Sequence, residues 1–313
     1  MTELVNVAGV AADPVGGVSV RRVVGVSEPV GGGVPAGLAD RLGDLDHRLR
    51  RLGSVLVAFS GGVDSGFLLA AAVRALGADA VVAATAVSPS LPALELGAAA
   101  RHAAILGVPH VAPATRELAR EGYRTNAGDR CYFCKAELLD VLVPLAQQLS
   151  IAAVATGTNA DDAIAGFRPG IRAAAERGAV APLRDAGLTK ADIRAAARDW
   201  GLAIWDKPAA ACLASRISYG VPVSAGRLAR VDRAEVALRL ALTAAGFPPR
   251  DLRVRDLGPA GARIEVDPEL VGVLVARPDL LTTVDGFPAV TVDPGGFRSG
   301  SMNELLADPD RYR

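Results

Sequence analysis

Short apolar runs alternate with longer helical patterns through the first two thirds of the chain. Five leucines from Leu38 to Leu52 recur at helical spacing and predict a lead-in helix. Apolar runs rich in Val and Ala follow, and they are too short for helices, so they predict buried strands. Strands are expected at 55–59, 80–86, 108–112 and 152–157, with helices over 64–76, 91–106 and 131–149. This alternation predicts an α/β fold, a parallel sheet with helices on both faces.

The pattern changes near Pro208. One more helix of the first series is expected over 188–200, with Thr189 or a neighbour as its N-cap. Beyond Ser224 the pattern predicts helices over 226–245 and after Asp267, and strands at 252–255, 263–266 and 290–292. Strands close together with intervening helices predict a small α+β domain. We therefore divide the chain into domains over 39–210 and 211–313, with the boundary near 206–218.

Residues 1–38 differ from both domains. They are rich in Gly and Val, and Pro14, Pro29, Pro35 and the run Gly31-Gly32-Gly33 interrupt regular structure. We expect a flexible arm, although its valines leave open an added edge strand.

Composition narrows the class of protein. The chain has 313 residues, half of them apolar, which suits two domains with a large core. Its 34 basic and 34 acidic residues cancel, which argues against a globally basic surface for nucleic acid and leaves only a local patch open. No apolar run of ~20 residues predicts a membrane span, and no signal peptide is recognisable. We expect a cytoplasmic protein with no membrane or nucleic-acid partner, whose three cysteines serve chemistry or metal binding.

The first strand runs directly into a Ser/Gly turn and a helix. The turn reads Ser60-Gly61-Gly62-Val63-Asp64-Ser65, with Asp64 and Ser65 at the predicted N-cap and first turn of the helix. Two glycines allow a tight turn, and the N–H groups and dipole of a helix start favour an anion. The stretch therefore predicts a phosphate cradle, against a plain strand–helix turn without a ligand. Its six residues resemble the PP-loop of the ATP pyrophosphatases, which cleave ATP between the α- and β-phosphates.

A second polar segment follows the fourth strand. It reads Thr156-Gly157-Thr158-Asn159-Ala160-Asp161-Asp162 and is expected at the same sheet edge as the Ser/Gly turn. Its carboxylates suit Mg²⁺ beside phosphates, and we assign Asp64 and Asp161 as Mg²⁺ ligands. The alternative is a helix start with Asn159 or Asp161 as N-cap, and both interpretations can hold together. Thr85 and Gly157 complete the nucleotide-binding set, and Arg168 faces phosphate or makes only a surface pair.

The cysteines form the third signal. Cys131 and Cys134 lie in Arg130-Cys131-Tyr132-Phe133-Cys134-Lys135, a C-x2-C that indicates metal or redox chemistry or else two small buried residues. Cys212 lies between Lys207 and Arg216, a setting that favours a thiolate, although a lone cysteine is more often a core residue. Three thiolates cannot close a four-coordinate zinc site unaided, but they can hold three irons of a cubane cluster.

Several blocks together carry a specific resemblance. They are the PP-loop, the Arg130–Lys135 block, the Gly157–Asp162 block and four shorter segments: 168–170, 211–217, 263–266 and 300–304. Over the region from about residue 48 to the end, the chain resembles the LarE family, the ATP-dependent sulfur transferases of nickel-pincer cofactor biosynthesis. For 39–210 this implies an adenine nucleotide alpha hydrolase-like, Rossmann-like fold.

The resemblance also implies an activity. ATP adenylates a carboxylate of pyridinium-3,5-biscarboxylic acid mononucleotide, pyrophosphate leaves, and sulfur displaces AMP to give a thiocarboxylate. Ser60 and Asp64 would serve adenylation, with ATP and Mg²⁺, and Cys212 the sulfur step. In one branch of the family the cysteine matching Cys212 gives up its sulfur; in the other, three cysteines bind a 4Fe-4S cluster. With Cys131 and Cys134 present, the chain resembles the cluster branch, supplied by sulfide or another sulfur donor. Family members form homohexamers.

An anionic substrate needs cations despite the zero net charge. Guanidinium groups suit carboxylate and phosphate oxygens, so four arginines are candidates for binding it: Arg216, Arg253, Arg255 and Arg263. The alternative is that these arginines only alternate along an exposed strand face. Arg298 and Ser301 are weaker candidates. Rival functions are an amidating synthetase of the NAD or GMP kind, a tRNA thiolase and a non-enzymatic nucleotide sensor.

Overall fold

The structure, a computed structural model, describes residues 36–164, 169–208, 211–298 and 300–302. The first described element is helix α1 (Ala36–Leu52), which confirms the lead-in helix. Most of the predicted arm (1–35) and Arg168 lie outside the described residues. No helix in the described part of the chain is both long enough and apolar enough to cross a membrane.

The first domain is built on a sheet of four parallel strands. These are β1 (Val55–Ala58), β2 (Val81–Ala84), β3 (His110–Val111) and β4 (Ala153–Thr156), in the order β3-β2-β1-β4. Strand β1 is central, pairing Val55 with Val81 of β2 and with Ala153 of β4. The two middle strands, β1 and β2, are apolar throughout and almost fully buried, as expected for a sheet with both faces covered. The predicted parallel sheet is confirmed.

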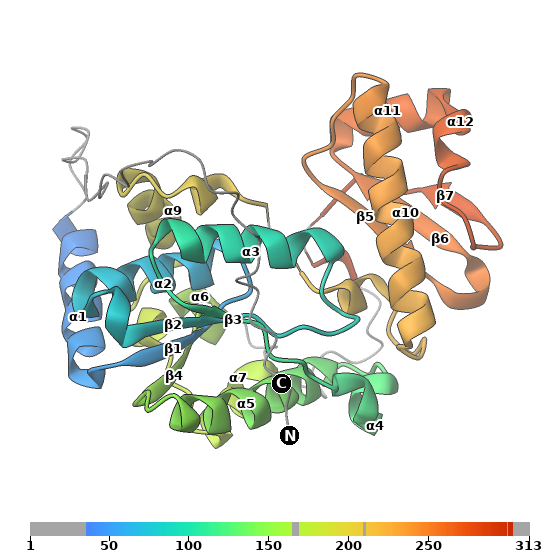
Figure 1. Ribbon diagram of the computed structural model, residues 1–313. Coiled ribbons are helices and arrows are strands. Elements are labelled where there is room, and N and C mark those ends of the chain that lie inside the picture. Colours follow the sequence, from blue (N-terminus) through green and yellow to red (C-terminus); the bar gives the residue numbers. More distant parts are fainter. Residues whose placement is uncertain (1–35, 165–168, 209–210, 299, 303–313) are drawn as a thin grey trace, which may run out of the picture.

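Helices cover both faces of this sheet (Figure 1). Val55, Val57 and Phe59 point to one face, where they pack with α1, α2 (Val63–Leu76), α3 (Ala93–Ile105), α8 (Pro182–Asp185) and α9 (Lys190–Asp199). Leu56 points to the opposite face, where it packs with α5 (Arg130–Gln148) and α7 (Pro169–Glu176). Alternate residues of one strand thus build two separate cores.

The chain after Ser224 forms a second, smaller unit with its own core. Helix α10 (Ala225–Ala244) packs on a sheet of β5 (Leu252–Asp256), β6 (Ala262–Val266) and β7 (Val290–Val292). Strands β5 and β6 are antiparallel, whereas β6 and β7 are parallel. Helices α11 (Pro268–Ala276) and α12 (Pro278–Leu281) complete the unit, so the predicted α+β arrangement is confirmed.

A fourth apolar cluster joins the two units. Tyr123, from the short helix α4 (Glu121–Arg124), packs with Leu213 and Ile217 and with Leu228 and Val231 of α10. The segment after Cys212, which includes the 3-10 turn η4 (Leu213–Arg216), therefore lies between the sheets. Our division at 210/211 stays a proposal, with this cluster as the contact across it.

Several predicted boundaries were wrong by a few residues. The N-cap of α2 is Gly62, not Asp64 or Ser65, because the chain already turns at Gly61, where φ is +74°. The second strand spans only 81–84, since 78–80 form the 3-10 turn η1 (Ala78–Ala80), and α3 begins after Pro92. The remaining short elements were not predicted: η2 (Glu117–Ala119), α4, α7, α8, η3 (Ala203–Asp206), η4, η5 (Gly258–Ala260) and α12. Helix α6 (Ala160–Ile164) is the helix start that the sequence offered as one interpretation of the segment after β4.

Candidate active site

The PP-loop joins the end of β1 to the start of α2. Ser65 organises it, because its hydroxyl lies 3.1 Å from the Ser60 hydroxyl, donates to the Gly62 carbonyl at 3.3 Å, and accepts from the Ser60 N–H. The first helical hydrogen bond of α2 runs from the Gly66 N–H to the Gly62 carbonyl at 2.9 Å. The N–H groups before Gly66 in the first turn therefore have no acceptor within the helix, and Ser60 is exposed beside them. This geometry suits an anion such as phosphate.

Gly157 brings the end of β4 against the start of α2. A Cβ atom at this position would lie 2.7 Å from the Ser65 nitrogen and 2.9 Å from the Ser65 Cα, both closer than real contacts allow. Only glycine fits this approach of two backbones. The PP-loop and the Gly157–Asp162 block therefore share one edge of the sheet, as the sequence predicted.

Asp64 is the acidic group of this edge. Its Oδ2 accepts from Lys190 Nζ at 2.5 Å and lies 3.4 Å from Asn159 Nδ2. Its Oδ1 is buried without a hydrogen-bond partner among the described residues. A buried carboxylate oxygen without a donor is an unusual cost, and a Mg²⁺ ion would remove it. Asp64 therefore fits the predicted Mg²⁺ role.

Asp161 and Asn159 lie beside Asp64 with different partners. Asn159 and Asp162 exchange hydrogen bonds between side chain and backbone at 3.0 and 3.3 Å, so the N-cap interpretation of Asn159 is confirmed. Asp161 is exposed, and its Oδ2 accepts the Lys190 N–H at 2.7 Å. No three His, Cys, Asp or Glu side chains in the described ranges lie close enough to form a metal site by themselves. The role of Asp161 in Mg²⁺ binding stays a prediction.

Two lysines reach this edge, and the sequence did not point to them as parts of it. Lys190 contacts Asp64, and Lys207 Nζ donates to the Gly61 carbonyl at 2.9 Å and to Glu95 at 2.6 Å. The suggested influence of Lys207 on Cys212 therefore competes with a direct ion pair to Glu95. Thr85 is buried, and its hydroxyl donates to the Phe59 carbonyl at 2.8 Å, directly before the PP-loop. Only spatial contacts, not sequence spacing, reveal the two lysines.

The three cysteines come from two distant segments that meet in the cluster around Tyr123. Cys131 and Cys134 lie in the first two turns of α5, and Cys212 is the N-cap of η4. Cys134 and Cys212 both pack against this cluster. Burial raises the pKa of Cys134, and the nearby Cys212 and Cys131 raise it further. The structure thus brings together thiols about 80 positions apart, while Cys131 itself is exposed.

Backbone contacts fix the Cys212 turn on the first domain. The Leu213 N–H donates to the Ser90 carbonyl at 2.9 Å, and the Ser90 and Tyr123 hydroxyls are 2.5 Å apart. From α5, Arg130 Nη1 donates to the Ala214 carbonyl at 2.9 Å. The position of Cys212 is therefore set from the loop after β2, from α4 and from α5 together.

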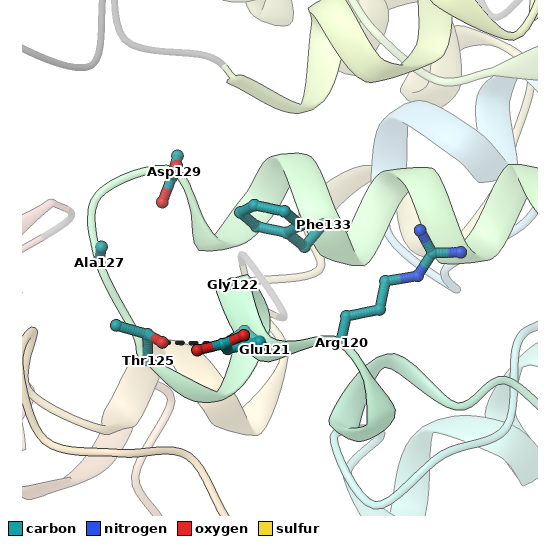
Figure 2. A pocket seen from close by; sticks show the side chains of 7 residues that line it. All are labelled: Arg120, Glu121, Gly122, Thr125, Ala127, Asp129 and Phe133. Carbon is teal, nitrogen blue, oxygen red and sulfur yellow. Dashed lines mark hydrogen bonds between the residues drawn. The ribbon is translucent and has the colours of Figure 1, made fainter.

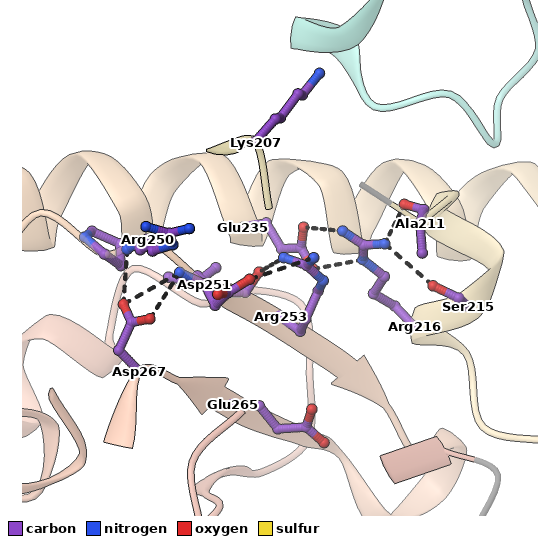
Figure 3. Close-up of polar contacts among 12 residues, drawn as sticks. Lys207, Ala211, Ser215, Arg216, Glu235, Arg250, Asp251, Arg253, Glu265 and Asp267 are labelled. Carbon is purple, nitrogen blue, oxygen red and sulfur yellow. Dashed lines mark hydrogen bonds and ion pairs between the residues drawn. The ribbon is translucent and has the colours of Figure 1, made fainter. Parts of the chain in front are cut away.

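Arg216 fixes the same turn from the second unit (Figure 3). Its Nε and Nη2 donate to both oxygens of Glu235 on α10, at 2.9 and 3.1 Å. Its Nη1 contacts the carbonyls of Ala211 and Cys212. Glu235 also accepts the Val254 N–H of β5 at 3.0 Å. Arg216 thus holds the Cys212 turn in the conformation that the structure shows.

The other candidate arginines are buried or half-buried in ion pairs. Glu265, fully buried, accepts from Arg255 at 2.6 Å, from Arg263 at 3.1 Å and from Ser301 at 3.1 Å. Arg253 lies 4.0 Å from the Asp251 carboxylate, and burial followed by Arg216 lowers its pKa to about 10. Every residue of β5 is buried, so alternation on an exposed strand face is wrong for Arg253 and Arg255.

The surface also has an open pocket beside α4 and the start of α5 (Figure 2). Its lining includes Arg120, Asp129 and Phe133, and all seven lining residues belong to the stretch 120–133. None of them belongs to the PP-loop or to the Gly157–Asp162 block. This pocket therefore flanks the cysteine-bearing turn of α5 and is separate from the phosphate cradle.

Comparison with known proteins shows which family the chain belongs to. No protein-family model matches it. The pyridinium-3,5-bisthiocarboxylic acid mononucleotide synthase of Lactiplantibacillus plantarum is 35% identical over 274 residues, which cover 87% of this chain and 96% of that enzyme. The chain belongs to the LarE family.

Two further relatives are named only as uncharacterised proteins. One, from Synechocystis, is 41% identical over 86% of this chain and 99% of its own length. The other, from Methanocaldococcus jannaschii, is 27% identical over 56% of this chain and 66% of its own length. The match to the LarE relative extends well beyond the PP-loop, which alone would mark only the wider superfamily.

Proposed function

We propose that this protein is an ATP-dependent sulfur transferase that converts pyridinium-3,5-biscarboxylic acid mononucleotide to its thiocarboxylate. The observation that carries the proposal is the relationship to a synthase of that product over nearly the full length of both chains. The PP-loop supports ATP as the activating reagent, because an anion-binding helix start lies beside a carboxylate with an unpartnered oxygen.

The first step, adenylation, gives the substrate carboxylate a better leaving group. A carboxylate is a poor electrophile because oxide would have to leave, whereas an acyl adenylate has a phosphate leaving group. The substrate oxygen attacks the α-phosphorus, and pyrophosphate departs. We expect the N–H groups of the PP-loop, and Lys190 beside Asp64, to stabilise charge on the departing pyrophosphate, and Asp64 would hold Mg²⁺. Ser60, exposed at the loop, would contact the phosphates.

The second step needs sulfur at the adenylated carbon. Cys131, Cys134 and Cys212 would hold a 4Fe-4S cluster, which when bound supplies an open iron for a sulfide to be transferred. Their convergence supports this, and each thiolate would bind a different iron, so the spacing of a single-ion site is not required. The chemical alternative is direct loss of the Cys212 sulfur, which would leave dehydroalanine and permit one turnover.

The third part of the function is substrate binding. The pyridinium nucleotide carries carboxylates and a phosphate, and Arg253, Arg255 and Arg263 lie together on β5 and β6. Arg255 and Arg263 share the Glu265 carboxylate, and Arg263 also lies 3.4 Å from the Asp293 carboxylate. We propose that the guanidinium groups of these strands bind the substrate anion, with Arg216 fixing the neighbouring Cys212 turn.

One experiment tests the function. Protein purified without air is mixed with ATP, Mg²⁺ and the pyridinium dicarboxylate, and pyrophosphate and thiocarboxylate are measured separately. Wild-type protein should yield both products, Ser60→Ala should yield neither, and Cys212→Ala should yield pyrophosphate without thiocarboxylate. A wild-type sample that releases no pyrophosphate with this substrate, but amidates an acid or shifts tRNA in a gel, contradicts the proposal.

The same sample distinguishes the two sulfur sources. A cluster predicts a brown protein with iron and acid-labile sulfide, and many product molecules per chain. Loss of hydrogen sulfide mass from the Cys212 peptide, with at most one product per chain, would instead support the sacrificial route.

A further inference from the structure

Arg130 is a buried cation whose charge the described carboxylates do not balance. It is the first residue of α5, and only 4% of its surface is exposed. Its Nη1 donates to the Asn126 side-chain oxygen at 2.5 Å and to the Ala214 carbonyl at 2.9 Å, and its guanidinium lies 5.4 Å from the Tyr219 ring centroid. All three partners are neutral.

Other buried arginines of this chain have a carboxylate partner. Arg216 has Glu235 at 2.9 Å and Arg255 has Glu265 at 2.6 Å. In the described ranges no Asp or Glu lies within ion-pair distance of Arg130. A buried charge without a counter-charge is costly, so folded proteins pair such charges. An anion is therefore expected beside Arg130.

The groups around Arg130 identify that anion by its chemistry. Cys131 follows Arg130 directly in α5, and Ala214, whose carbonyl accepts from Arg130, lies two residues after Cys212. Cys134 and Cys212 pack against the cluster that contains Ala214 and Tyr123, and the Tyr123 hydroxyl lies 2.5 Å from the neutral Ser90 hydroxyl. Sulfur is thus the neighbour that can carry negative charge, as a thiolate, a metal-bound thiolate or a sulfide.

Arg130 also helps to hold the Cys212 turn near α5, because its side chain donates to the Ala214 carbonyl. Its partner Asn126 donates from Nδ2 to the carbonyls of Ser218 at 2.8 Å and Val221 at 2.7 Å. Asn126 adopts a left-handed conformation with φ of +57°, which this network must stabilise. The side chains of Arg130 and Asn126 thus donate to the carbonyls of four residues in and after η4: Ala214, Ile217, Ser218 and Val221.

We propose that Arg130 is the positioning residue of the sulfur site. Its guanidinium balances negative charge on sulfur at Cys131 and Cys212 and, through the Ala214 carbonyl, keeps the Cys212 turn against α5. The inference rests on the proposed function for its meaning in catalysis, but its charge and its contacts are properties of the chain alone. It therefore has a test without ATP or substrate.

The test compares two alkylating reagents on the full-length protein, reduced and treated with chelator so that the thiols are free. Iodoacetate and iodoacetamide react alike: the thiolate attacks the methylene carbon, a C–S bond forms and iodide leaves. They differ in charge, since only iodoacetate is an anion. The ratio of their rates at one cysteine cancels the thiolate fraction and reports the local charge. Mass spectrometry of the Cys212 peptide gives both rates.

In the wild-type protein the iodoacetate-to-iodoacetamide ratio at Cys212 should exceed that of the same peptide after unfolding. Arg130→Gln should lower the ratio about five-fold, because one fixed positive charge close to the sulfur is lost. Arg130→Lys should keep it within about two-fold, because the charge remains. The matched control is Arg124→Gln, an exposed arginine that donates to the Leu118 and Ala119 carbonyls and should change nothing.

Two outcomes overturn the inference. One is a wild-type ratio no higher than that of the unfolded peptide, which needs no variant and so does not depend on folding. The other is Arg130→Lys behaving like Arg130→Gln while circular dichroism shows a native fold, since that indicates a structural role alone. If the ratios behave as expected and no thiocarboxylate forms from any variant, the proposed function fails while the charged sulfur site stands.

Discussion

The PP-loop edge and the ion pairs around Glu265 in the second unit differ in how many of their polar groups have hydrogen-bond partners. At the PP-loop, an Asp64 oxygen has no partner among the described residues, and the first turn of α2 has N–H groups with no helical acceptor. On β6, Glu265 uses both oxygens on Arg255, Arg263 and Ser301. A region prepared for a ligand leaves hydrogen-bonding capacity unused, whereas a region that maintains architecture uses it internally. Substitutions in the first should change activity, and substitutions in the second should change stability.

The largest expected effect is on stability, at Glu265. Glu265→Gln leaves Arg255 and Arg263 without their shared buried counter-charge. The free energy of unfolding should fall by about 3–5 kcal/mol, as for other broken buried pairs. Urea denaturation measures it, and Glu269→Gln, on the exposed first turn of α11, is the matched control that should stay close to wild type. Equal losses in both variants would show that burial of Glu265 is not the cause.

The second prediction concerns the PP-loop, where a substitution should lower activity and leave stability nearly unchanged. Asp64→Asn removes the charge that a Mg²⁺ ion requires but keeps the shape, so pyrophosphate release should fall on the order of 100-fold. The urea midpoint should change little, because the Lys190–Asp64 ion pair that is weakened is partly exposed to solvent and Asp64 Oδ1 has no partner to lose. The control Asp79→Asn, exposed beyond the other end of α2, should keep full activity. An Asp64→Asn protein with wild-type pyrophosphate release would remove Asp64 from the site.

The third prediction concerns the contact that joins the two segments of this edge. Gly157→Ala places a methyl group 2.7 Å from the Ser65 nitrogen, where backbone cannot yield cheaply. We expect a loss of about 1–3 kcal/mol in unfolding free energy together with weaker ATP binding, measured by denaturation and by calorimetric titration. Gly43→Ala, in α1 with nothing within 4 Å, should be neutral or slightly stabilising. Unchanged ATP affinity in Gly157→Ala would argue that the two backbones need not touch.

The smallest expected effect is a loss of unfolding free energy at acid pH, caused by the buried His102 of α3. Burial lowers the pKa of His102 below its usual value of 6.5, outweighing the contact with the Gly66 backbone that raises it. The unfolded chain therefore takes up a proton near pH 6.5 that the folded chain resists, so stability should fall as pH drops below that value. His102→Gln should flatten this dependence between pH 7 and pH 5 in denaturation curves. A slope identical to wild type would assign the acid sensitivity to other groups.

Much of the first domain was predictable because its signals are local. Period and run length identified β1, β4, α2 and α5, and the Ser/Gly turn identified the phosphate cradle, since glycine placement depends on backbone geometry near in sequence. Short elements such as α4 and α8 were missed because their four residues cover about one helical turn, too few for the apolar pattern to repeat. Boundaries shifted where a proline or a positive φ, as at Pro92 and Gly61, decided them.

The arginines show the limit of such reasoning. Arg253 and Arg255 alternate along their strand in a way typical of an exposed face, yet every residue of β5 is buried. Arg255 is paired with the buried Glu265 of the neighbouring strand, 10 positions away, and no local pattern records this pairing. Lys190 and Lys207 reach the PP-loop across more than 120 positions for the same reason.

The sequence by itself determined the parallel sheet, the position of the phosphate cradle and the three thiols as a chemically distinct set, because each follows from residue type and near spacing. Only the tertiary structure decided that Cys212 meets Cys134 around Tyr123, that Arg255 pairs with the buried Glu265, and that no Asp or Glu of the described residues pairs with Arg130. The reason is physical: a charge acquires its role from what surrounds it in space, and those surroundings come from parts of the chain that the sequence keeps far apart.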